Sequence, residues 1–238
     1  MTSLVLTLAA PLQAWGSSSR FATRGTDDAP TRSGIVGLLA AAQGRRRTDP
    51  LEDYVGLRLG VRIDQPGQLL RDFQTARSLD GKESMPLSYR FYRADARYLA
   101  VVSGEPTLLE SIAAALRRPV FPLYLGRRSC PPAEPLLPRL VGATLGETIR
   151  DETWMAADWW KRRYGQEPPM LEFRVDKGAA PELTIEGETV QRDEPISFDP
   201  EYRQYGWRTV ELGRVAVPGV QTPPPVGVLS HDAFSAVD

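Results

Sequence analysis

Residues 57–64 have the sequence LRLGVRID, in which an apolar side chain stands at every odd-numbered position. Alternation of this kind is typical of a β-strand with one buried and one polar face. The Gln65-Pro66-Gly67 sequence that follows favours a turn. We therefore predict a half-buried strand over residues 57–64 that ends at this turn.

Three further strands are predicted around this one. Residues 4–8 (LVLTL) predict a mostly buried strand that stops at Pro11, where an irregular loop begins that is rich in small residues. Residues 98–102 (YLAVV) and 121–125 (FPLYL) predict two more strands, the second of them short.

Two helices are predicted between these strands. Thr31 or Ser33 can cap the first helix, whose apolar residues recur at helical spacing over residues 35–42. Gly44 is well placed to end it in a left-handed conformation. A second amphipathic helix is predicted over residues 106–118, with a proline in its first turn.

The resulting order is strand, helix, strand, strand, helix, strand, and it predicts the fold class α+β. This βαββαβ order is the ferredoxin-like split pattern, which is also the plan of RNA-recognition (RRM-like) domains. Two helices would cover one face of an antiparallel sheet, and the other face would stay open to a ligand. We predict such a domain over residues 1–146.

Residues 68–96 form an insertion between the second and third strands. It mixes positive charges with aromatic rings, which suits phosphate neutralisation together with base stacking. The alternative is a hairpin whose rings fold back onto the sheet. The residues concerned are Arg71, Arg77, Lys82, Arg90, Arg93, Phe73, Tyr89, Phe91 and Tyr92.

The remainder of the chain differs in charge. Residues 1–150 carry 20 Lys and Arg against 14 Asp and Glu, whereas residues 151–238 carry 9 against 16. We predict a small β-rich domain over 147–238, with strands at 183–190 and 209–217 and an extended tail after Pro218. The tryptophan-rich residues 150–165 are left unassigned.

Arginine dominates the positive charges: 26 of the 29 basic residues are arginine, whose planar fork pairs with phosphate and stacks on bases. A GC-rich genome is the alternative explanation. Arg45, Arg46 and Arg47 follow the first helix, and Arg127 and Arg128 follow the last predicted strand, so both runs can rim the sheet. Either run can also be a solvated surface, and Trp15 can equally be a core anchor beside a tight turn.

The composition argues against catalysis. Triads of the Ser/His/Asp or Cys/His type need a histidine in a pocket, and the single histidine, His231, stands in the Pro-rich tail. Cys130 is the single cysteine and is expected to be a buried thiol. We expect a protein without metal, cofactor or enzymatic activity. No apolar run is long enough to span a membrane, and a cytoplasmic location is expected.

Several stretches of the sequence resemble the CasD-type subunits (RAMP superfamily) of the type I-E CRISPR Cascade complex. The long ones are residues 10–16 (APLQAWG), 30–34 (PTRSG) with 37–39 (GLL), and 124–131 (YLGRRSCP). Residues 72–75 (DFQT) and 192–195 (RDEP) resemble further segments of the family. The resemblance extends over nearly the whole chain and stops at about residue 218.

The resemblance implies a function as well as a fold. It implies a ferredoxin-like fold with a β-hairpin thumb between the second and third strands, where residues 68–96 lie. It implies a non-catalytic subunit that holds the 5′ handle of the CRISPR RNA, caps the backbone filament, contacts the large subunit and meets target DNA only through the complex. The alternatives are a metal-independent endoribonuclease that processes CRISPR precursor RNA and a generic RNA-recognition module.

The resemblance also implies RNA-binding residues. Arg127 and Arg128 are the leading candidates for handle binding, and Arg32 and Ser33 are expected to contact phosphate at a helix N-terminus. Gln74 stands where the family often has histidine, which weakens an acid–base role for that segment. The remaining candidates are Arg77, Arg90 and Arg93 in the thumb or its base, and Arg24, Arg45, Arg46, Arg47 and Trp15.

Overall fold

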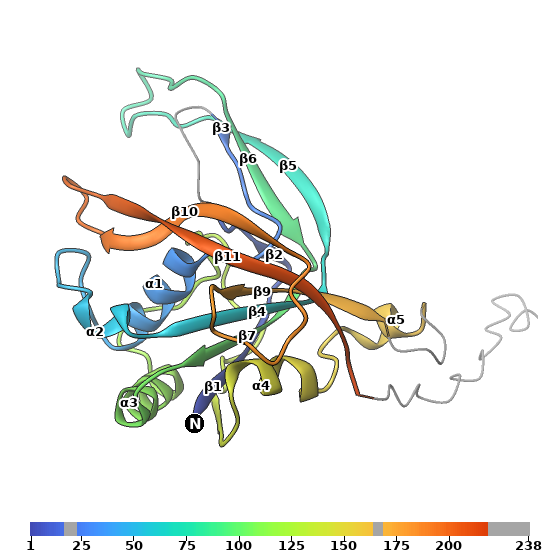
Figure 1. The fold of residues 1–238 in the computed structure, drawn as a ribbon. Helices are drawn as coiled ribbons and strands as arrows, with labels where there is room; N and C mark the ends of the chain where they lie inside the picture. Colours follow the sequence, from blue (N-terminus) through green and yellow to red (C-terminus); the bar gives the residue numbers. More distant parts are fainter. Residues whose placement is uncertain (17–22, 164–168, 219–238) are drawn as a thin grey trace, which may run out of the picture.

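The computed structural model of the chain describes residues 1–16, 23–163 and 169–218, and Figure 1 shows its α+β fold. The strands are β1 (Ser3–Ala9), β2 (Leu12–Gln13), β3 (Thr23–Arg24), β4 (Arg58–Gln65), β5 (Gln68–Gln74), β6 (Ser88–Ala94), β7 (Arg97–Ser103), β8 (Arg139–Val141), β9 (Met170–Asp176), β10 (Gly187–Ser197) and β11 (Gln204–Ala216). The helices are α1 (Arg32–Ala42), α2 (Glu52–Val55), α3 (Pro106–Arg117), α4 (Leu145–Asp151) and α5 (Asp158–Lys161).

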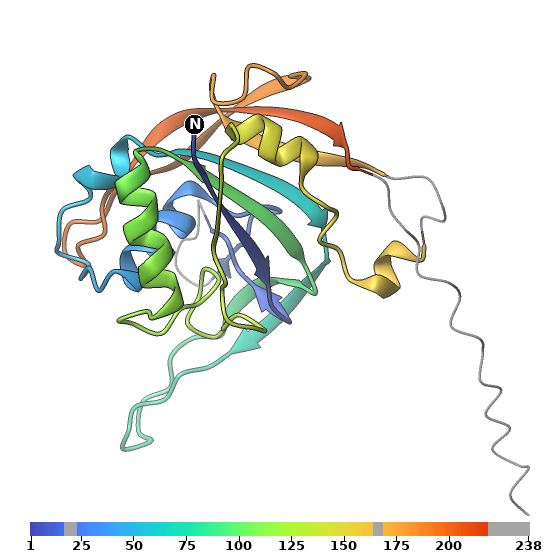
Figure 2. The ribbon, with the colours of Figure 1, turned by 90° about the horizontal axis from the view of Figure 1, so that it is seen from below.

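One large sheet organises the molecule. Its order is β10-β11-β9-β4-β7-β1-β8, and all neighbouring strands run antiparallel. α1 and α3 pack on one face and α4 on the other (Figures 1 and 2). Because successive side chains of a strand point to opposite faces, β1 contributes to both cores. Leu4 and Leu6 join the core beneath α1 and α3, whereas Val5 joins the core beneath α4.

The strand predicted over residues 57–64 is confirmed as β4, but the prediction that only one face is buried was wrong. Arg62 and Asp64 on the supposed polar face are completely buried. The Arg62 guanidinium donates to both carboxylate oxygens of Asp64 and to main-chain carbonyls of residues 149–153, at 2.6 to 3.0 Å. The end of α4 and the segment after it therefore cover the polar face and satisfy its charges.

Both predicted helices are confirmed. The Thr31 hydroxyl caps α1 by accepting a hydrogen bond from the Gly34 amide, and Gly44 follows the helix with a φ of 77°. α3 begins at Pro106, and the Glu105 carboxylate caps it by accepting from the Leu108 amide at 2.8 Å. These local signals were sufficient to place the helices from the sequence.

The short strand predicted over residues 121–125 was wrong. This segment does not pair as a strand, because Val120 and Phe121 donate their amides to carbonyls at the end of α1 and Pro122 has no amide. The strand beside β1 is instead β8, which pairs with the first residues of β1. β8 was not predicted because three residues show no usable periodicity.

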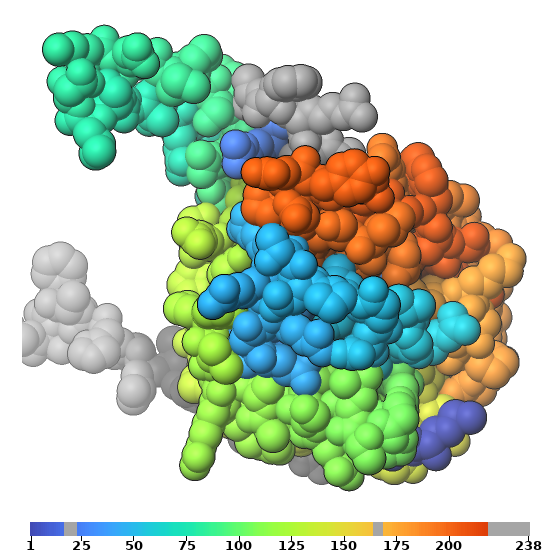
Figure 3. Space-filling model, turned by 90° about the vertical axis from the view of Figure 1, so that its left-hand side faces the viewer, coloured from blue at the N-terminus to red at the C-terminus, as the bar shows by residue number. Residues whose placement is uncertain are grey.

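The insertion over residues 68–96 contains a β-hairpin. β5 and β6 pair antiparallel over their whole length, and the hairpin projects from the body of the molecule (Figures 2 and 3). The loop predicted after Pro11 contributes the short strands β2 and β3, which both pair with β6. A second, four-stranded sheet therefore joins the hairpin to the body.

The predicted C-terminal strands are present with different limits. β11 confirms the strand at 209–217 but starts earlier, whereas β10 begins only at Gly187. Residues 183–186 are not a strand, because Ala180 and Leu183 lie in a turn and fill the core beneath α4. α4 and β9 were not predicted.

β9 pairs with β4, so the C-terminal strands continue the sheet of the first half of the chain. The division into two domains near residue 146 stays a prediction. The tail predicted after Pro218 lies outside the described residues. None of the helices within the described ranges has the length and apolar character required to cross a membrane.

Candidate RNA-binding surface

The two faces of the hairpin differ in chemistry. Residues directly opposite each other on paired strands share a face, and in the β5–β6 register Arg71 lies opposite Phe91 and Phe73 opposite Tyr89. We call this the aromatic face; its members are Leu69, Arg71, Phe73, Tyr89, Phe91 and Arg93. The opposite face, which we call the arginine face, consists of Gln68, Leu70, Asp72, Gln74, Ser88, Arg90, Tyr92 and Ala94 together with Arg24 of β3.

Two arginines stand side by side on the arginine face. Arg24 and Arg90 are register partners of the parallel strands β3 and β6, where like charges repel. Within the described residues neither guanidinium is paired with a carboxylate, and the buried Nε of Arg90 has no hydrogen-bond partner. Because a phosphate can accept hydrogen bonds from two guanidinium groups, this pair is suited to an anion that bridges them.

Arg127 is committed to the protein itself. Its guanidinium donates to the Phe91 carbonyl at 3.0 Å and to the Arg24 and Gly25 carbonyls at 2.8 Å, and it lies 5.0 Å from the centroid of the Tyr92 ring. Arg127 therefore joins β3 to β6. The neighbouring Arg128 is exposed, and its side chain bonds to no described residue.

The remaining hairpin candidates are spread along it. The Arg93 Nε donates to the Asp27 carbonyl at 3.4 Å, where the hairpin meets the body. The Gln74 amide donates to Asp72 at 3.0 Å, farther along the arginine face. Arg77 lies beyond β5 and bridges to Ser84 through its backbone, near the tip.

The aromatic face carries exposed rings. Phe73 is 68% exposed and Tyr89 is 38% exposed, and the Arg71 guanidinium lies 5.5 Å from the centroid of the Tyr89 ring. Rings that are open on one side and flanked by arginine can stack on nucleobases. The alternative in which the rings fold back onto the sheet is therefore wrong for Phe73 and Tyr89.

Trp15 is a core residue. It is 1% exposed, its indole donates to the buried amide oxygen of Gln13 at 3.1 Å, and its ring would collide with any side chain at position 34. A Cβ on Gly126 would lie 1.7 Å from the Ala14 carbonyl oxygen, and Gly126 has a φ of 87°. The segments around residues 15, 34 and 126 therefore interlock at positions where only glycine fits.

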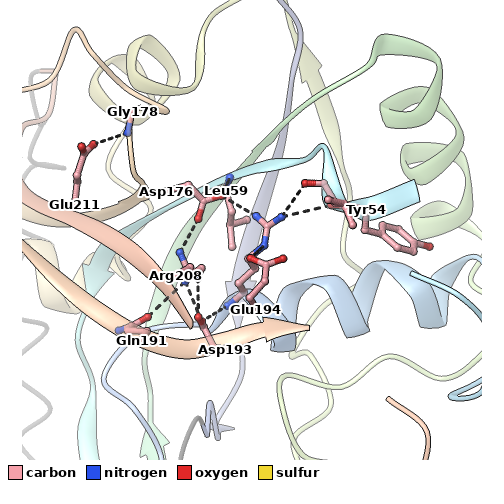
Figure 4. A network of polar contacts seen from close by, with 11 residues as sticks. Tyr54, Leu59, Asp176, Gly178, Gln191, Asp193, Glu194, Arg208 and Glu211 are labelled. Carbon is pink, nitrogen blue, oxygen red and sulfur yellow. Dashed lines mark hydrogen bonds and ion pairs between the residues drawn. The ribbon is translucent and has the colours of Figure 1, made fainter. Parts of the chain in front are cut away.

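Arg32 is also buried, in a network of ion pairs (Figure 4). Its guanidinium lies 2.7 Å from Asp176 and 2.7 Å from Glu194, and its amide donates to Asp193 at 2.7 Å. Arg208 binds Asp176 and Asp193 from the other side, both at 2.6 Å. The network fixes the first turn of α1 to β9, β10 and β11.

Arg208 was not identified from the sequence, and only the structure places it in this network. Burial lowers the pKa of Arg208, but the hydrogen bond and the charge of Asp193 outweigh burial and hold that pKa above its usual value. Ser33, the second candidate at the start of α1, is partly exposed and its hydroxyl lies 3.4 Å from that of Thr31.

The arginine triplet lies apart from the hairpin. Arg45, Arg46 and Arg47 follow the C-terminal end of α1, an 11-residue helix about 16 Å long. Arg45 is paired with Asp53 and lies over the Tyr54 ring, whereas Arg46 and Arg47 are exposed. The structure thus brings Arg24, Arg90 and Arg127 together, with Arg128 next to Arg127 in the chain, whereas the triplet follows the C-terminal end of α1.

Comparisons with known proteins agree with the arrangement of these segments. A family model described as CRISPR-associated protein (Cas_Cas5) matches residues 3–211. The chain belongs to this family. The "CRISPR system Cascade subunit CasD" of Escherichia coli (strain K12) is 33% identical over 154 residues, which is 56% of this chain and 68% of that protein.

Solved structures of the family agree as well. A chain of a "CRISPR RNA-guided surveillance complex" is 32% identical, with a TM-score of 0.72 over 91% of each chain. A "Crystal structure of Cas protein" is 33% identical, with a TM-score of 0.69 over 93% of this chain and all of that one. The resemblance to a CasD-type chain is therefore confirmed, and the five stretches that carried it all lie within the matched range.

The structure shows where groups suited to metal or thiol chemistry lie among the described residues. Within the described residues, no group of three or more His, Cys, Asp or Glu side chains is placed to hold a metal. Cys130 is buried as predicted, and burial raises the pKa of its thiol. His231 lies outside the described residues.

Proposed function

We propose that this protein is a non-catalytic Cascade subunit that binds the 5′ handle of the CRISPR RNA on the arginine face of its hairpin. The observation that carries the proposal is the adjacent Arg24–Arg90 pair, two cations without carboxylate partners among the described residues. Phosphate groups of a single-stranded handle would neutralise the pair, with exposed Arg128 alongside.

The aromatic face supports recognition of bases by the same hairpin. Phe73 and Tyr89 are exposed where an unpaired base can stack on them. A strand whose phosphates lie on the arginine face and whose bases turn onto the other face has to bend around the hairpin. The hairpin is therefore proposed as the thumb that kinks the RNA.

The protein contacts are proposed to lie elsewhere. β10, β11 and the turn between them carry exposed Ile196, Trp207 and Tyr202, and residues 151–238 have an excess of acidic side chains. Such a surface repels RNA and suits proteins. We propose that it contacts the large subunit, that the chain caps the backbone filament in the cytoplasm, and that target DNA is met through the assembled complex.

The fold underlying this function is proposed to be ferredoxin-like. The sheet order β4-β7-β1-β8, with α1 and α3 on the same face, supports that assignment for residues 1–146. The β-rich C-terminal domain is supported by the hairpin of β10 and β11, although β9 extends the same sheet.

Binding and cleavage can be tested in one experiment. The purified full chain is titrated in EDTA against labelled repeat RNA with an intact handle and against a shuffled RNA of equal length, and the products are run on a denaturing gel. We expect the handle RNA to bind more tightly and to stay intact. A discrete cut at the edge of the handle would instead identify a metal-independent endoribonuclease.

A charge-matched pair of variants assigns the surface. We expect Arg24→Gln with Arg90→Gln to weaken handle binding about tenfold, because two phosphate contacts are lost. Arg46→Gln with Arg47→Gln removes the same charge from the segment after α1, away from the arginine face, and should change affinity less than twofold. Equal losses in both variants would contradict the arginine face as the binding site.

A further inference from the structure

A second cluster of aromatic and basic side chains surrounds the short helix α5. The Arg163 guanidinium lies 5.1 Å from the centroid of the Trp159 ring and 5.4 Å from that of Trp160. The two indoles meet edge to face, with their centroids 5.5 Å apart. Arg163 can reach both rings because residues three and four positions apart share one side of a helical turn.

The two tryptophans have different environments. Trp160 packs against a small core formed by Trp154, Ala156, Leu171 and Val217, which anchors the helix to the sheet. Trp159 is 42% exposed and does not belong to that core. A purely structural role accounts for Trp160, but it leaves the open face of Trp159 without a function.

The positive charges near Trp159 make no ion pair among the described residues. Lys161, Arg162 and Arg163 are consecutive, and they are three of the nine basic residues in an otherwise acidic stretch, 151–238. Within the described residues, none of the three is paired with a carboxylate. Among residues 155–163, which extend four positions to either side of Trp159, Asp158 is the single acidic residue.

We infer that Trp159, Lys161 and Arg162 form a second binding site for single-stranded nucleic acid. A base stacks on the open face of Trp159, whose ring Arg163 holds in place, and flanking phosphates lie on Lys161 and Arg162. The shared chemistry is that of an unpaired base with its phosphates, from either RNA or DNA.

The site is separate from the hairpin. In both ribbon views α5 lies at one end of the molecule and the hairpin tip at the other (Figures 1 and 2). α5 lies nearer the base of the hairpin, since the Ala157 amide donates to Gln65 just before β5 at 3.0 Å. A strand bound at the Arg24–Arg90 pair and a strand bound at α5 therefore contact different side chains. The inference goes beyond handle binding and is tested separately from it.

The test uses the full chain with Arg24→Gln and Arg90→Gln, so that phosphate binding at the hairpin is weakened. Labelled 15-nucleotide dT and U oligomers are titrated by fluorescence anisotropy. Adding Trp159→Ala should weaken binding about tenfold, as expected for loss of one stacked base. Adding Lys161→Gln with Arg162→Gln should reduce the slope of log K against log salt by about 1.4.

Trp207 provides a matched control. It is 68% exposed and lies 5.9 Å from the Arg192 guanidinium, but it stands in the acidic C-terminal hairpin. Trp207→Ala should change affinity less than twofold, and Trp159→Phe, which keeps a ring, should restore most of the binding. Thermal melting of every variant verifies that the fold is retained.

Each outcome decides the inference. Tighter binding of dT identifies DNA as the source of the strand, tighter binding of U identifies RNA, and either supports the site. Equal losses for Trp159→Ala and Trp207→Ala would overturn it, as would absence of saturable binding by both oligomers, which would leave Trp159 as a protein contact. If the unsubstituted protein does not bind the handle RNA, the proposed function is contradicted, but the test of Trp159 is unaffected.

Discussion

Arginines of the body and arginines on the arginine face differ in whether a carboxylate lies beside them. Arg32, Arg62 and Arg208 lie in the body, on α1, β4 and β11, and each is ion-paired with at least one carboxylate. Arg24 of β3 and Arg90 of the hairpin stand next to each other without such partners among the described residues. The number of arginines therefore does not separate the two groups, whereas the presence or absence of a carboxylate partner does.

The difference has an energetic basis. A buried guanidinium loses its hydration, so it is tolerated only where carboxylates and carbonyls replace the water. Removing one partner then leaves an uncompensated charge in the core. An exposed guanidinium keeps its hydration, contributes little to stability, and stays available to a ligand.

The largest expected effect concerns Arg62. Arg62→Ala leaves the fully buried Asp64 without its cation and three main-chain carbonyls without their donor. We expect a loss of about 3 to 5 kcal/mol in the free energy of unfolding, measured by urea denaturation. Arg24→Ala is the comparison on the arginine face, where the Arg24 side chain is exposed, and should cost less than about 0.5 kcal/mol. Similar losses in both variants would abolish the distinction between the two regions.

The sequence predicts those parts of the fold that depend on local periodicity. The alternation of β1 and β4 and the helical spacing of α1 were sufficient to place these elements. The burial of Arg62 was not predictable, because α4 covers it from about 90 residues away. β8 is too short to show a pattern, and the segment predicted in its place bonds to α1 instead.

The candidate site was predictable as a region rather than as residues. The mixture of arginine and aromatic residues over residues 68–96 marks the segment that forms the hairpin, where Arg90 lies, and its role in binding RNA stays a prediction. Arg127 and Arg32 were expected to contact RNA directly, but one bonds to main-chain carbonyls and the other to Asp176 and Glu194. Nothing in the sequence near Arg32 reveals the carboxylates, which come from strands more than 140 residues away.

A smaller effect on stability is expected for Arg127 than for Arg62, and none for its neighbour Arg128. Arg127→Ala removes three hydrogen bonds to carbonyls that join β3 to β6, and should cost about 1 to 2 kcal/mol in urea denaturation. Arg128→Ala should leave stability unchanged but reduce the salt slope of RNA binding by about 0.7, one phosphate contact on a single strand. The comparison would fail if Arg128→Ala destabilised the protein as much as Arg127→Ala.

The smallest effect concerns an ion pair at the border between the two regions. Asp28 accepts two hydrogen bonds from Arg174, at 2.7 and 2.6 Å, and its side chain is 49% exposed. Partial burial alone raises the pKa of Asp28, but the hydrogen bonds and charge of Arg174 outweigh it and leave that pKa below its usual value.

Because the pKa of Asp28 is lower in the folded protein, the Asp28–Arg174 pair stabilises the fold at pH values above the ordinary aspartate pKa of about 3.9. This stabilisation is lost as the pH falls through the pKa that Asp28 has in the folded protein. Asp28→Asn should therefore cost about 0.5 kcal/mol at pH 7, since solvent screens a half-exposed pair. The difference from the parent should shrink towards zero as urea denaturation is repeated at lower pH, down to about pH 3. A difference that stays constant over this range would show that the Asp28 carboxylate contributes through packing and not through its charge.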